Sequence, residues 1–441
     1  MRIAVLGAGV TGGVIARELA GDGHEVVVYE AGAEVGGLVA SHTVGGTPLE
    51  IFYHHIFTHE HHIRDLIEEL GVDDKLEWLP SSVGILDADD RIWPFTSPRD
   101  LLTFGRIPVV DRLRMGVTSL LAPHLTDWRK LDDVPIEDWI RRLMGKRVLD
   151  EVWDPMLQVK WGEVREEVPA AWLWARLSQR QRSRDKKDMG ELLGYMHGGF
   201  KQLYAALGED LARRGVKLML NTPVHRIVCG AGGTHRIETA AGSDSFDHVV
   251  STLPVPVFAR LADGLPEVYR KRVESVEYMS VICVILTLDR QVNPVYWLNV
   301  ADRTIPFGAF IEHTNLLPTS DYDGHHVAYM GRYFAPPHYS AEAAALATGD
   351  LHEIAEDWIG HLAKINPDFD RSWVTSVAPF RTFYGAPVVK VGHGKRRLPF
   401  ATPVEGIWLA TMAQIYPDDR GQSEGVHLAL DCVRSMNLPR A

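Results

Sequence analysis

The chain opens with Met1-Arg-Ile-Ala-Val-Leu-Gly7-Ala-Gly9-Val-Thr-Gly12-Gly13, continues as an apolar helical run to Ala20, and then reads Glu25-Val-Val-Val-Tyr-Glu30. This order is that of a βαβ dinucleotide-binding unit: a strand, a glycine turn, a helix, a second strand and an acidic residue. The glycines permit a tight turn, close approach of a pyrophosphate to the helix N-terminus, and close packing of the helix on the strand. Glu30 stands where a carboxylate accepts hydrogen bonds from a ribose. This stretch predicts a dinucleotide site but does not separate nicotinamide from flavin.

Composition limits the classes of protein and partner. The chain has 441 residues, 46% hydrophobic and 24% charged, enough for one large core or two to three smaller ones. Acidic residues (58) outnumber Lys and Arg (46), and the net charge of −12 argues against a nucleic-acid partner. Cys229, Cys283 and Cys432 lie far apart in apolar stretches, which indicates buried thiols. Because the first strand starts at Arg2 and no apolar run reaches about 18 residues, we expect a cytoplasmic protein.

Beyond the opening unit, the pattern changes between helices and strands. Residues 97–187 read as almost wholly helical with prolines as punctuation, and so predict an inserted helical subdomain. Helices are also predicted from His197-Gly198-Gly199-Phe200 to Leu211 and over 422–436, and strands over 216–224 and 406–411.

Four segments resemble, in order, the motifs of the protoporphyrinogen oxidase, phytoene desaturase and flavin amine oxidase superfamily, which are flavoproteins with two dinucleotide-binding domains. The opening turn with Glu30 resembles that family's adenine-dinucleotide motif, and Gly36-Gly37 resembles its double glycine. Gly198-Gly199 with Asn221-Thr-Pro-Val224 resembles the central motif. Residues 406–425 resemble the C-terminal flavin motif, in which a helix N-terminus faces the isoalloxazine. The resemblance spans most of the chain and implies FAD as the cofactor.

The resemblance also assigns the cofactor contacts. The residues are Gly7, Gly9, Val10, Thr11, Gly12, Glu30, Ala31, Gly36, Gly37, Leu38, Val224, Thr252, Met412, Gln422, Ser423 and Glu424. Two positions depart from the family pattern. Leu38 replaces the usual Arg or Lys, and Thr411-Met412 replaces the usual Gly-Asp, so phosphate and ribityl contacts must come from elsewhere, such as backbone N–H groups or Gln414. The string Tyr416-Pro-Asp-Asp-Arg-Gly421 resembles a bacterial branch described only as FAD-dependent oxidoreductases.

The predicted fold class is α/β, with a Rossmann-type FAD-binding domain, a mixed-sheet substrate domain and a helical insertion. The FAD-binding domain is assigned to residues 1–50, 190–260 and 396–441, the substrate domain to 51–96 and 261–395, and the insertion to 97–189.

Five histidines lie within nine positions: His54, His55, His59, His61 and His62. They do not predict a metal site, because ligation needs imidazoles that converge, whereas His54 and His55 point to opposite faces of an extended segment. Solvated or core histidines are one interpretation. The resemblance supports another, because Phe52-Tyr53-His54-His55 is the counterpart of a Gly-x-His element beneath the flavin. His54 and His55 are therefore candidates for contact with flavin or substrate.

Arg332, Tyr333, Arg381 and Tyr384 are the other catalytic candidates. Strands that present Arg and Tyr can line a polar ligand pocket, because Arg binds carboxylate or phosphate bidentately and Tyr supplies a ring face and a hydroxyl. A solvated sheet face is the alternative. The segment Lys160-Trp161-Gly162 is a further candidate for the surroundings of the flavin.

Residues 100–125 combine apolar side chains with Arg106, Arg112 and Arg114, a pattern that could lie on a membrane surface. A buried amphipathic helix is the commoner origin of such a pattern, so peripheral membrane contact is the less favoured interpretation.

The sequence thus predicts an FAD-dependent oxidoreductase that abstracts a hydride from a small-molecule substrate, such as a phosphorylated or nucleotide-linked sugar or a carboxylate-bearing metabolite. Two alternatives stay open. One is a redox-neutral flavoenzyme resembling UDP-galactopyranose mutase, and the other is a non-catalytic flavin-binding escort protein.

Overall fold

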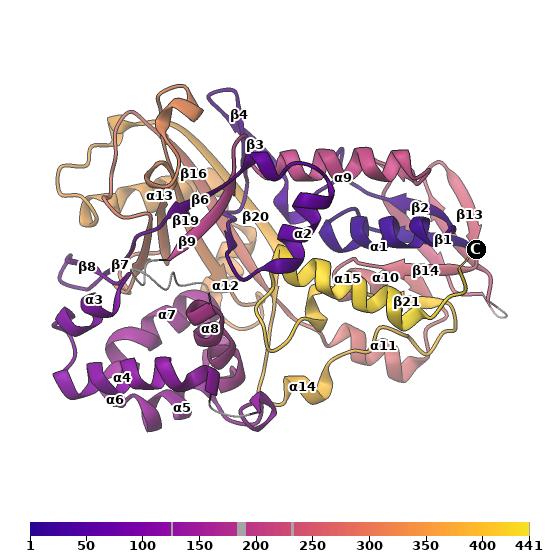
Figure 1. The fold of residues 1–441 in the computed structure, drawn as a ribbon. Coiled ribbons are helices and arrows are strands. Elements are labelled where there is room, and N and C mark those ends of the chain that lie inside the picture. Colours follow the sequence, from indigo (N-terminus) through magenta and orange to yellow (C-terminus); the bar gives the residue numbers. More distant parts are fainter. Residues whose placement is uncertain (125–126, 183–190, 231–232, 441) are drawn as a thin grey trace.

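The computed structural model describes residues 1–124, 127–182, 191–230 and 233–440. A five-stranded parallel sheet in the order β10-β2-β1-β14-β21 forms one end of the molecule (Figure 1). Its strands are β1 (Arg2–Leu6), β2 (Glu25–Tyr29), β10 (Lys217–Met219), β14 (His248–Ser251) and β21 (Ile407–Leu409). Segments far apart in the sequence therefore build one Rossmann-type sheet, which confirms the predicted fold class.

Both faces of this sheet are covered, which is why its strands are almost continuously apolar. One face packs under the parallel helices α1 (Val10–Gly21), α9 (Lys201–Arg213) and α15 (Gln422–Met436), seen side by side in Figure 1. The other packs against a small sheet and two helices, namely β11 (Val224–Val228), β12 (His235–Thr239), β13 (Gly242–Phe246), β15 (Ala262–Asp263), α10 (Val255–Leu261) and α11 (Glu267–Glu274).

The strand predicted over 216–224 is instead two strands, β10 and β11, in different sheets. Between them Asn221 has a φ of 51°, in the left-handed region that ends an extended segment. The prediction was wrong here because it assigned Asn221-Thr-Pro223 to the strand, although Asn and Pro favour a turn.

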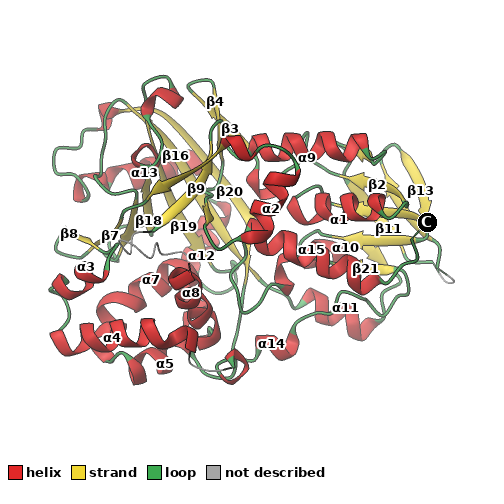
Figure 2. Cartoon of the chain, in the orientation of Figure 1, coloured by secondary structure: helices red, strands yellow, loops and turns green. Residues whose placement is uncertain are grey.

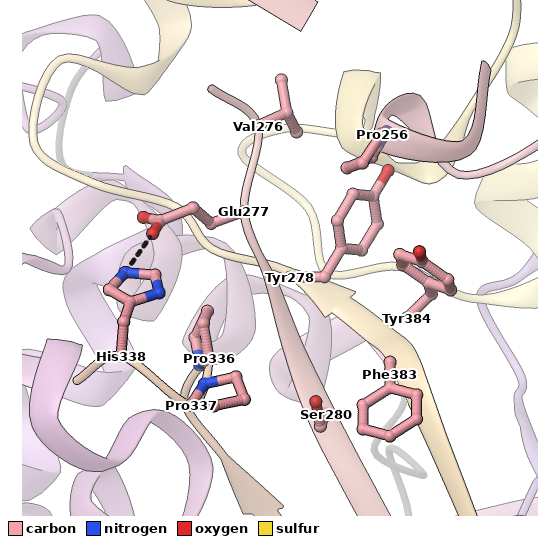
Figure 3. Close-up of a pocket in the computed structure, with 10 residues that line it drawn as sticks. All are labelled: Pro256, Val276, Glu277, Tyr278, Ser280, Pro336, Pro337, His338, Phe383 and Tyr384. Atoms are coloured by element: carbon pink, nitrogen blue, oxygen red, sulfur yellow. Dashed lines mark ion pairs between the residues drawn. The ribbon is translucent and has the colours of Figure 1, made fainter. Parts of the chain in front are cut away.

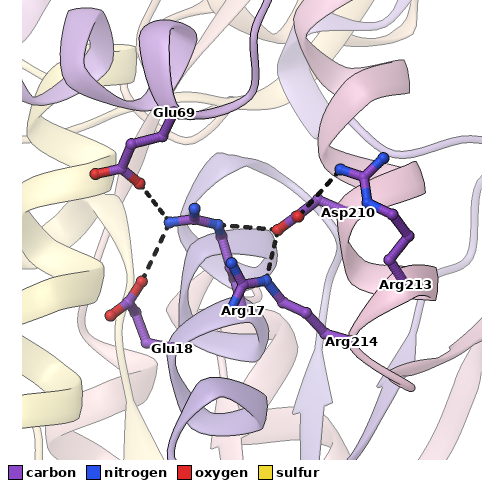
Figure 4. Close-up of polar contacts among 6 residues, drawn as sticks. All are labelled: Arg17, Glu18, Glu69, Asp210, Arg213 and Arg214. Atoms are coloured by element: carbon purple, nitrogen blue, oxygen red, sulfur yellow. Dashed lines mark hydrogen bonds and ion pairs between the residues drawn. The ribbon is translucent and has the colours of Figure 1, made fainter.

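An ion-pair network joins α1 to α9 (Figure 4). The Asp210 carboxylate accepts hydrogen bonds from Arg214 Nε at 2.7 Å, Arg17 Nε at 3.0 Å and Arg213 Nη2 at 3.1 Å. Burial alone raises the pKa of this carboxyl, but the three guanidinium groups outweigh burial and the net pKa is lowered. The network therefore stabilises the packing of the two helices in the ionised form of Asp210.

We expect Asp210→Asn to lower the free energy of unfolding by about 1–3 kcal/mol at pH 7, because three guanidinium groups lose their charged partner. A depressed carboxyl pKa contributes stability above the ordinary value of 3.8, and this contribution is lost as the pH falls through the lower pKa of the folded state. Urea unfolding at pH 7 and near pH 3 measures the difference. Asp431→Asn, at an exposed pair with Arg434, is the control and should change little.

The second large sheet has seven strands in the order β20-β16-β19-β18-β17-β7-β8. They are β7 (Val83–Leu86), β8 (Ile92–Pro94), β16 (Tyr278–Leu288), β17 (Trp297–Val300), β18 (Ala309–Glu312), β19 (His326–Phe334) and β20 (Val374–Pro387). The sheet is mixed because β17 and β7 pair in parallel while the other pairs are antiparallel. Helices α12 (Ala341–Thr348) and α13 (Leu351–Gly360) pack on one face.

Smaller elements join the two large sheets. They are β3 (Ser41–Val44), β4 (Thr47–Glu50), β5 (Ile56–Phe57), β6 (Leu76–Pro80), β9 (Leu192–Met196), α2 (His61–Glu69) and α14 (His393–Arg396). The three-stranded sheet β5-β9-β6 connects segments that the sequence assigns to different domains.

The insertion forms a separate group of helices (Figure 2). They are α3 (Pro98–Thr103), α4 (Val109–Leu121), α5 (Ile136–Leu143), α6 (Lys146–Val148), α7 (Asp154–Trp161) and α8 (Ala170–Arg182). Their buried side chains form a core of their own, which continues onto the large sheet. Within the described ranges, no helix is long and apolar enough to cross a membrane.

Candidate functional site

The glycine turn between β1 and α1 meets the double glycine Gly36-Gly37. A Cβ on Gly37 would lie 3.1 Å from Gly9 Cα, and a Cβ on Gly12 would lie only 1.9 Å from the Gly7 carbonyl oxygen, so neither position accepts a side chain freely. Gly9, in contrast, has room for a side chain. Its φ is −68°, and a Cβ there would meet only Gly37 Cα, 3.9 Å away. The protein itself leaves this side of Gly9 open, as the close approach of a pyrophosphate requires.

Helix α1 begins at this turn without a capping side chain and without an acidic residue in its first turn. Its first N–H groups and the positive end of its dipole are therefore free to meet an anion. Val10 and Thr11 lie in this first turn, and Thr11 Oγ1 donates to the carbonyl oxygen of Gly425 at 3.2 Å. That contact brings the beginnings of α1 and α15 together.

Glu30 holds the other side of the turn. Its Oε2 accepts a hydrogen bond from the Ala8 N–H and its Oε1 from the Gly32 N–H, both at 2.7 Å. The Thr222 N–H donates to the Glu30 carbonyl oxygen at 2.8 Å, and Val224 begins β11 two residues later. Glu30, the exposed Ala31 beside it and Val224 thus lie around one loop, which is the arrangement expected for the adenosine end of a dinucleotide.

The remaining predicted cofactor residues occupy three places. Thr252, at the end of β14, lies beneath the turn, where its Oγ1 donates to the Leu6 carbonyl oxygen at 2.8 Å. Leu38 is half-buried in a short 3-10 turn beyond the double glycine. Met412 is half-buried and starts the short turn 412–414 after β21.

The N-terminus of α15 carries an unpaired buried donor. Gln422 Oε1 accepts from Tyr204 Oη at 2.7 Å, whereas Gln422 Nε2 has no hydrogen-bond partner among the described residues. Gln422 and Ser423 are buried, and no side chain caps the helix. A buried unpaired amide is costly unless a ligand atom accepts from it.

Three features of the site fit FAD: the open side of Gly9, the uncapped start of α1 and the unpaired Gln422 amide. The ADP half would be held by the glycine turn and Glu30, and the flavin half by the N-terminus of α15.

Just before α15, four elements bring charged side chains together. Asp419 pairs with Arg176 of α8 at 3.3 Å, with its neighbour Arg420 at 3.4 Å and with Lys160 of α7 at 3.5 Å. Arg420 Nη2 donates to the Tyr333 hydroxyl, and Lys160 Nζ lies 4.5 Å from the centroid of the Tyr333 ring. Lys160, Arg176, Asp419 and Arg420 with Tyr333 are hereafter called the cationic cluster. Three cations share one carboxylate, and the cluster carries an excess of positive charge.

Burial and charge shift the pKa values within the cationic cluster. Burial on its own raises the pKa of the Tyr333 hydroxyl, but Arg420 and Lys160 outweigh it, so the net pKa is lowered. Burial also lowers the pKa of the Lys160 ammonium, and the charge of Arg420 lowers it further. For Asp419, burial acts upward but the charges of Lys160 and Arg176 hold the pKa well below its usual range. Asp419 is therefore ionised throughout the neutral range.

Two further carboxyls lie beside this cluster but do not neutralise it. Burial raises the pKa of Glu60 to about 7 and that of Glu424 to about 8, and repulsion from Glu60 adds to the shift at Glu424. A buried carboxyl with such a pKa holds a proton for much of the time near neutral pH. The predicted cofactor residue Glu424 thus presents a largely neutral group at the start of α15.

His54 and His55 lie near the cationic cluster as neutral imidazoles. Burial lowers the pKa of His54 to about 4 and that of His55 to about 3. His54 Nδ1 lies 2.5 Å from the Phe52 carbonyl oxygen, and the positive charge of Arg420 also acts on His54. The His55 ring lies edge-on to Trp297, with centroids 6.0 Å apart. Within the described ranges, no group of three or more His, Cys, Asp or Glu side chains is arranged to hold a metal ion.

The structure does not bring Arg332 and Arg381 to Tyr333. Both arginines lie beside Ile282 on the sheet face covered by α12 and α13, whereas Tyr333 points to the opposite face. Arg332 donates to the Pro306 carbonyl oxygen at 2.8 Å, and Arg381 donates to carbonyl oxygens at the end of α12. The two arginines therefore do not line one pocket with Tyr333. Their guanidinium groups donate to backbone carbonyl oxygens, and Arg332 also pairs with Glu342 Oε1 at 2.6 Å.

Tyr384 lies elsewhere again. It lines an open pocket of about 200 Å³ together with Tyr278, Phe383 and residues of the segment after β19 (Figure 3). Its hydroxyl accepts from Arg260 Nη2 at 3.2 Å, and its ring lies edge-on to Tyr278. These contacts of Tyr384 do not involve the cationic cluster, whereas the carbonyl oxygen of the neighbouring Gly385 accepts from Arg420 Nε at 2.5 Å.

Asp419 and Arg420 were not predicted as site residues. Their only signal in the sequence was the Tyr416–Gly421 string, and nothing local placed that string beside Lys160 and Arg176, which are more than 240 residues away in the chain.

The chain resembles known proteins in sequence and in fold. The family model for flavin containing amine oxidoreductase matches residues 10–418. A 15-cis-phytoene desaturase from Synechococcus elongatus is 24% identical over 449 residues, covering 93% of this chain and 90% of that protein.

Solved structures show the same fold. An oxidoreductase from Methanosarcina mazei aligns with a TM-score of 0.74 at 18% identity, covering 99% of this chain and 100% of that one. A putrescine oxidase aligns with a TM-score of 0.72 at 16% identity, covering 99% of both chains. Together with the match to most of the chain, these findings show that the protein belongs to the flavin-containing amine oxidoreductase family, whose members use FAD.

Proposed function

We propose that this chain is an FAD-dependent oxidoreductase that takes a hydride from a small-molecule substrate carrying a carboxylate or phosphate group. The observation that carries the proposal is the cationic cluster, in which three cations face one carboxylate at the flavin end of the site. The proposed substrate classes are phosphorylated or nucleotide-linked sugars and carboxylate-bearing metabolites, because each carries such an anionic group.

The charge balance explains why an anion fits. Lys160, Arg176 and Arg420 carry three positive charges against the single negative charge of Asp419, and Glu60 and Glu424 hold protons for much of the time. Lys160 and Arg420 are largely buried, and cations removed from water are costly unless they are paired. A carboxylate or phosphate supplies the missing charge, and Arg420 can bind it with the planar geometry of a guanidinium.

Bound FAD supplies the hydride acceptor. The protein supplies the position of the substrate through the cationic cluster. When the reacting carbon bears a hydroxyl or an amine, the proton of that group must also leave. In its ionised form Tyr333 can accept this proton, because Arg420 and Lys160 stabilise the phenolate inside the cluster, which then still carries one net positive charge.

We expect Lys160→Met to weaken binding of an anionic ligand about 10- to 100-fold, the range of one charge-assisted contact. The flavin spectrum reports binding when carboxylates, phosphosugars, neutral sugars and amines are titrated into the FAD-loaded protein. Lys146→Met is the matched control, because Lys146 belongs to the same insertion but its side chain is 76% exposed.

Preferential spectral perturbation by anions, lost in Lys160→Met with the FAD content intact, supports the proposal. Perturbation by amines alone contradicts it. If Lys160→Met instead fails to retain FAD while Lys146→Met retains it, the cluster belongs to the cofactor and not to the substrate.

A further inference from the structure

We propose that the outer face of α4 pairs two copies of this chain about a two-fold axis. The α4 face is defined as Val109, Val110, Leu113, Val117, Leu120 and Leu121. Helix α4 lies in the insertion, at the end of the molecule away from the Rossmann sheet (Figure 1). The pairing is independent of the redox chemistry proposed above.

The α4 face is the main exposed apolar surface of the described chain. Of the ten large hydrophobic side chains that the described residues expose, six form this face and a seventh, Leu102, lies on the adjoining α3. The six are between 47% and 66% exposed, which is on the order of 600 Å² of apolar surface, close to the about 800 Å² that each partner buries in a standard interface. A contiguous apolar patch of this size lies at the upper end of the range found on monomeric proteins, where the largest patch is often functional.

The spacing of these residues indicates a helix as the partner. Val110, Leu113, Val117 and Leu120 follow one another at intervals of three, four and three residues, the a and d positions of a heptad. Valine stands at both a positions and leucine at both d positions, the combination that favours two strands when the helices are parallel. Met115, at the f position opposite this seam, is buried against the protein's own core. The seam therefore points outward on a helix that is already folded and anchored.

A second copy accounts for the face better than an anionic lipid surface does. Lipid binding by a helix uses basic side chains beside the apolar face that can reach head groups. Arg112 instead donates to the carbonyl oxygens of Ile107 at 2.8 Å and Leu102 at 2.6 Å. Arg114 likewise donates to carbonyl oxygens at the end of α5, and Arg106 pairs with Glu151 at 3.0 Å.

A self-complementary seam also suits a two-fold dimer. In such a dimer the same patch on each copy forms a closed interface. Because no other protein is needed to cover the α4 face, purified protein alone suffices for the test.

Sedimentation of the FAD-loaded chain from about 1 to 100 µM measures the pairing, with a dissociation constant expected near micromolar for so small an interface. We expect the wild type to shift from monomer to dimer over this range. We expect Val117→Glu to remain monomeric, because its dissociation constant should be at least 100-fold higher. Val268→Glu is the control, because Val268 is 85% exposed on α11 and remote from the face. Val117→Lys repeats the test with the opposite charge, and thermal unfolding shows that each variant folds.

Three results would overturn the proposal: a wild type that stays monomeric at 100 µM, a dimer that persists in both Val117 variants, or a dimer lost equally in Val268→Glu. Co-sedimentation with vesicles of phosphatidylcholine and phosphatidylserine is measured in parallel. A monomer that binds vesicles, with binding lost in Val117→Glu, would assign the α4 face to lipid and would likewise reject the dimer.

Discussion

Gly9→Val is expected to fold and to lose its flavin. A valine can adopt the Gly9 backbone, whose φ is −68° and ψ is 179°, and its Cβ would meet only Gly37 Cα at 3.9 Å. The side chain would fill the open space beside the turn, where the pyrophosphate must approach the backbone. We expect FAD affinity to fall at least about 100-fold, a loss of about 2.7 kcal/mol.

Flavin absorbance per protein and titration of apo-protein with FAD measure this loss. Gly360→Val is the matched control, because a Cβ at Gly360 meets nothing within 4 Å and the residue lies at the end of α13. Thermal unfolding of the two apo-proteins should give similar midpoints, since a bound ligand stabilises only the protein that binds it. Normal flavin content in a folded Gly9→Val protein would place the dinucleotide elsewhere.

Arg420→Met is expected to slow turnover strongly while FAD remains bound. Arg420 joins the cationic cluster through Tyr333 and Asp419 and also donates from Nε to the Gly385 carbonyl oxygen at 2.5 Å. Its loss removes the charge that lowers the Tyr333 pKa and one of the cations proposed to bind the substrate. We expect kcat/KM to fall about 1,000-fold, in line with the loss of a buried electrostatic contact to the reacting group.

The pH profile separates this role from a purely structural one. Without Arg420, the Tyr333 pKa rises, so the pH at which activity sets in should move upward. Arg420→Lys keeps the charge but not the planar fork, and it should restore the pH profile more fully than the substrate affinity. Arg434→Met, at a side chain 71% exposed on α15, is the control. A normal profile and rate in Arg420→Met would remove the cationic cluster from the proposed chemistry.

The sequence by itself determined the local architecture of the cofactor site. The glycine turn, Glu30 and the closing helix 422–436 could be predicted because their requirements are local. At Gly12 there is no room for a Cβ because the Gly7 carbonyl oxygen lies too close, and both residues belong to the same short turn. The apolar periodicity of the closing helix is likewise a property of residues close together in the sequence. The turn at Asn221 also has a local signal, Asn221-Thr-Pro223, and was missed because these residues were assigned to the strand.

Only the tertiary structure decided which charged side chains meet. Arg332 and Tyr333 are neighbours in β19, yet successive strand residues point to opposite faces. The packing of α12 and α13 on one face of the sheet decides which face of β19 lies toward the flavin end. No local sequence pattern specifies this packing. Lys160 and Asp419 are 259 residues apart and meet because α7 packs against the segment before α15. Long-range packing, which carries no periodic signal in the sequence, determined both the cationic cluster and the outward direction of α4.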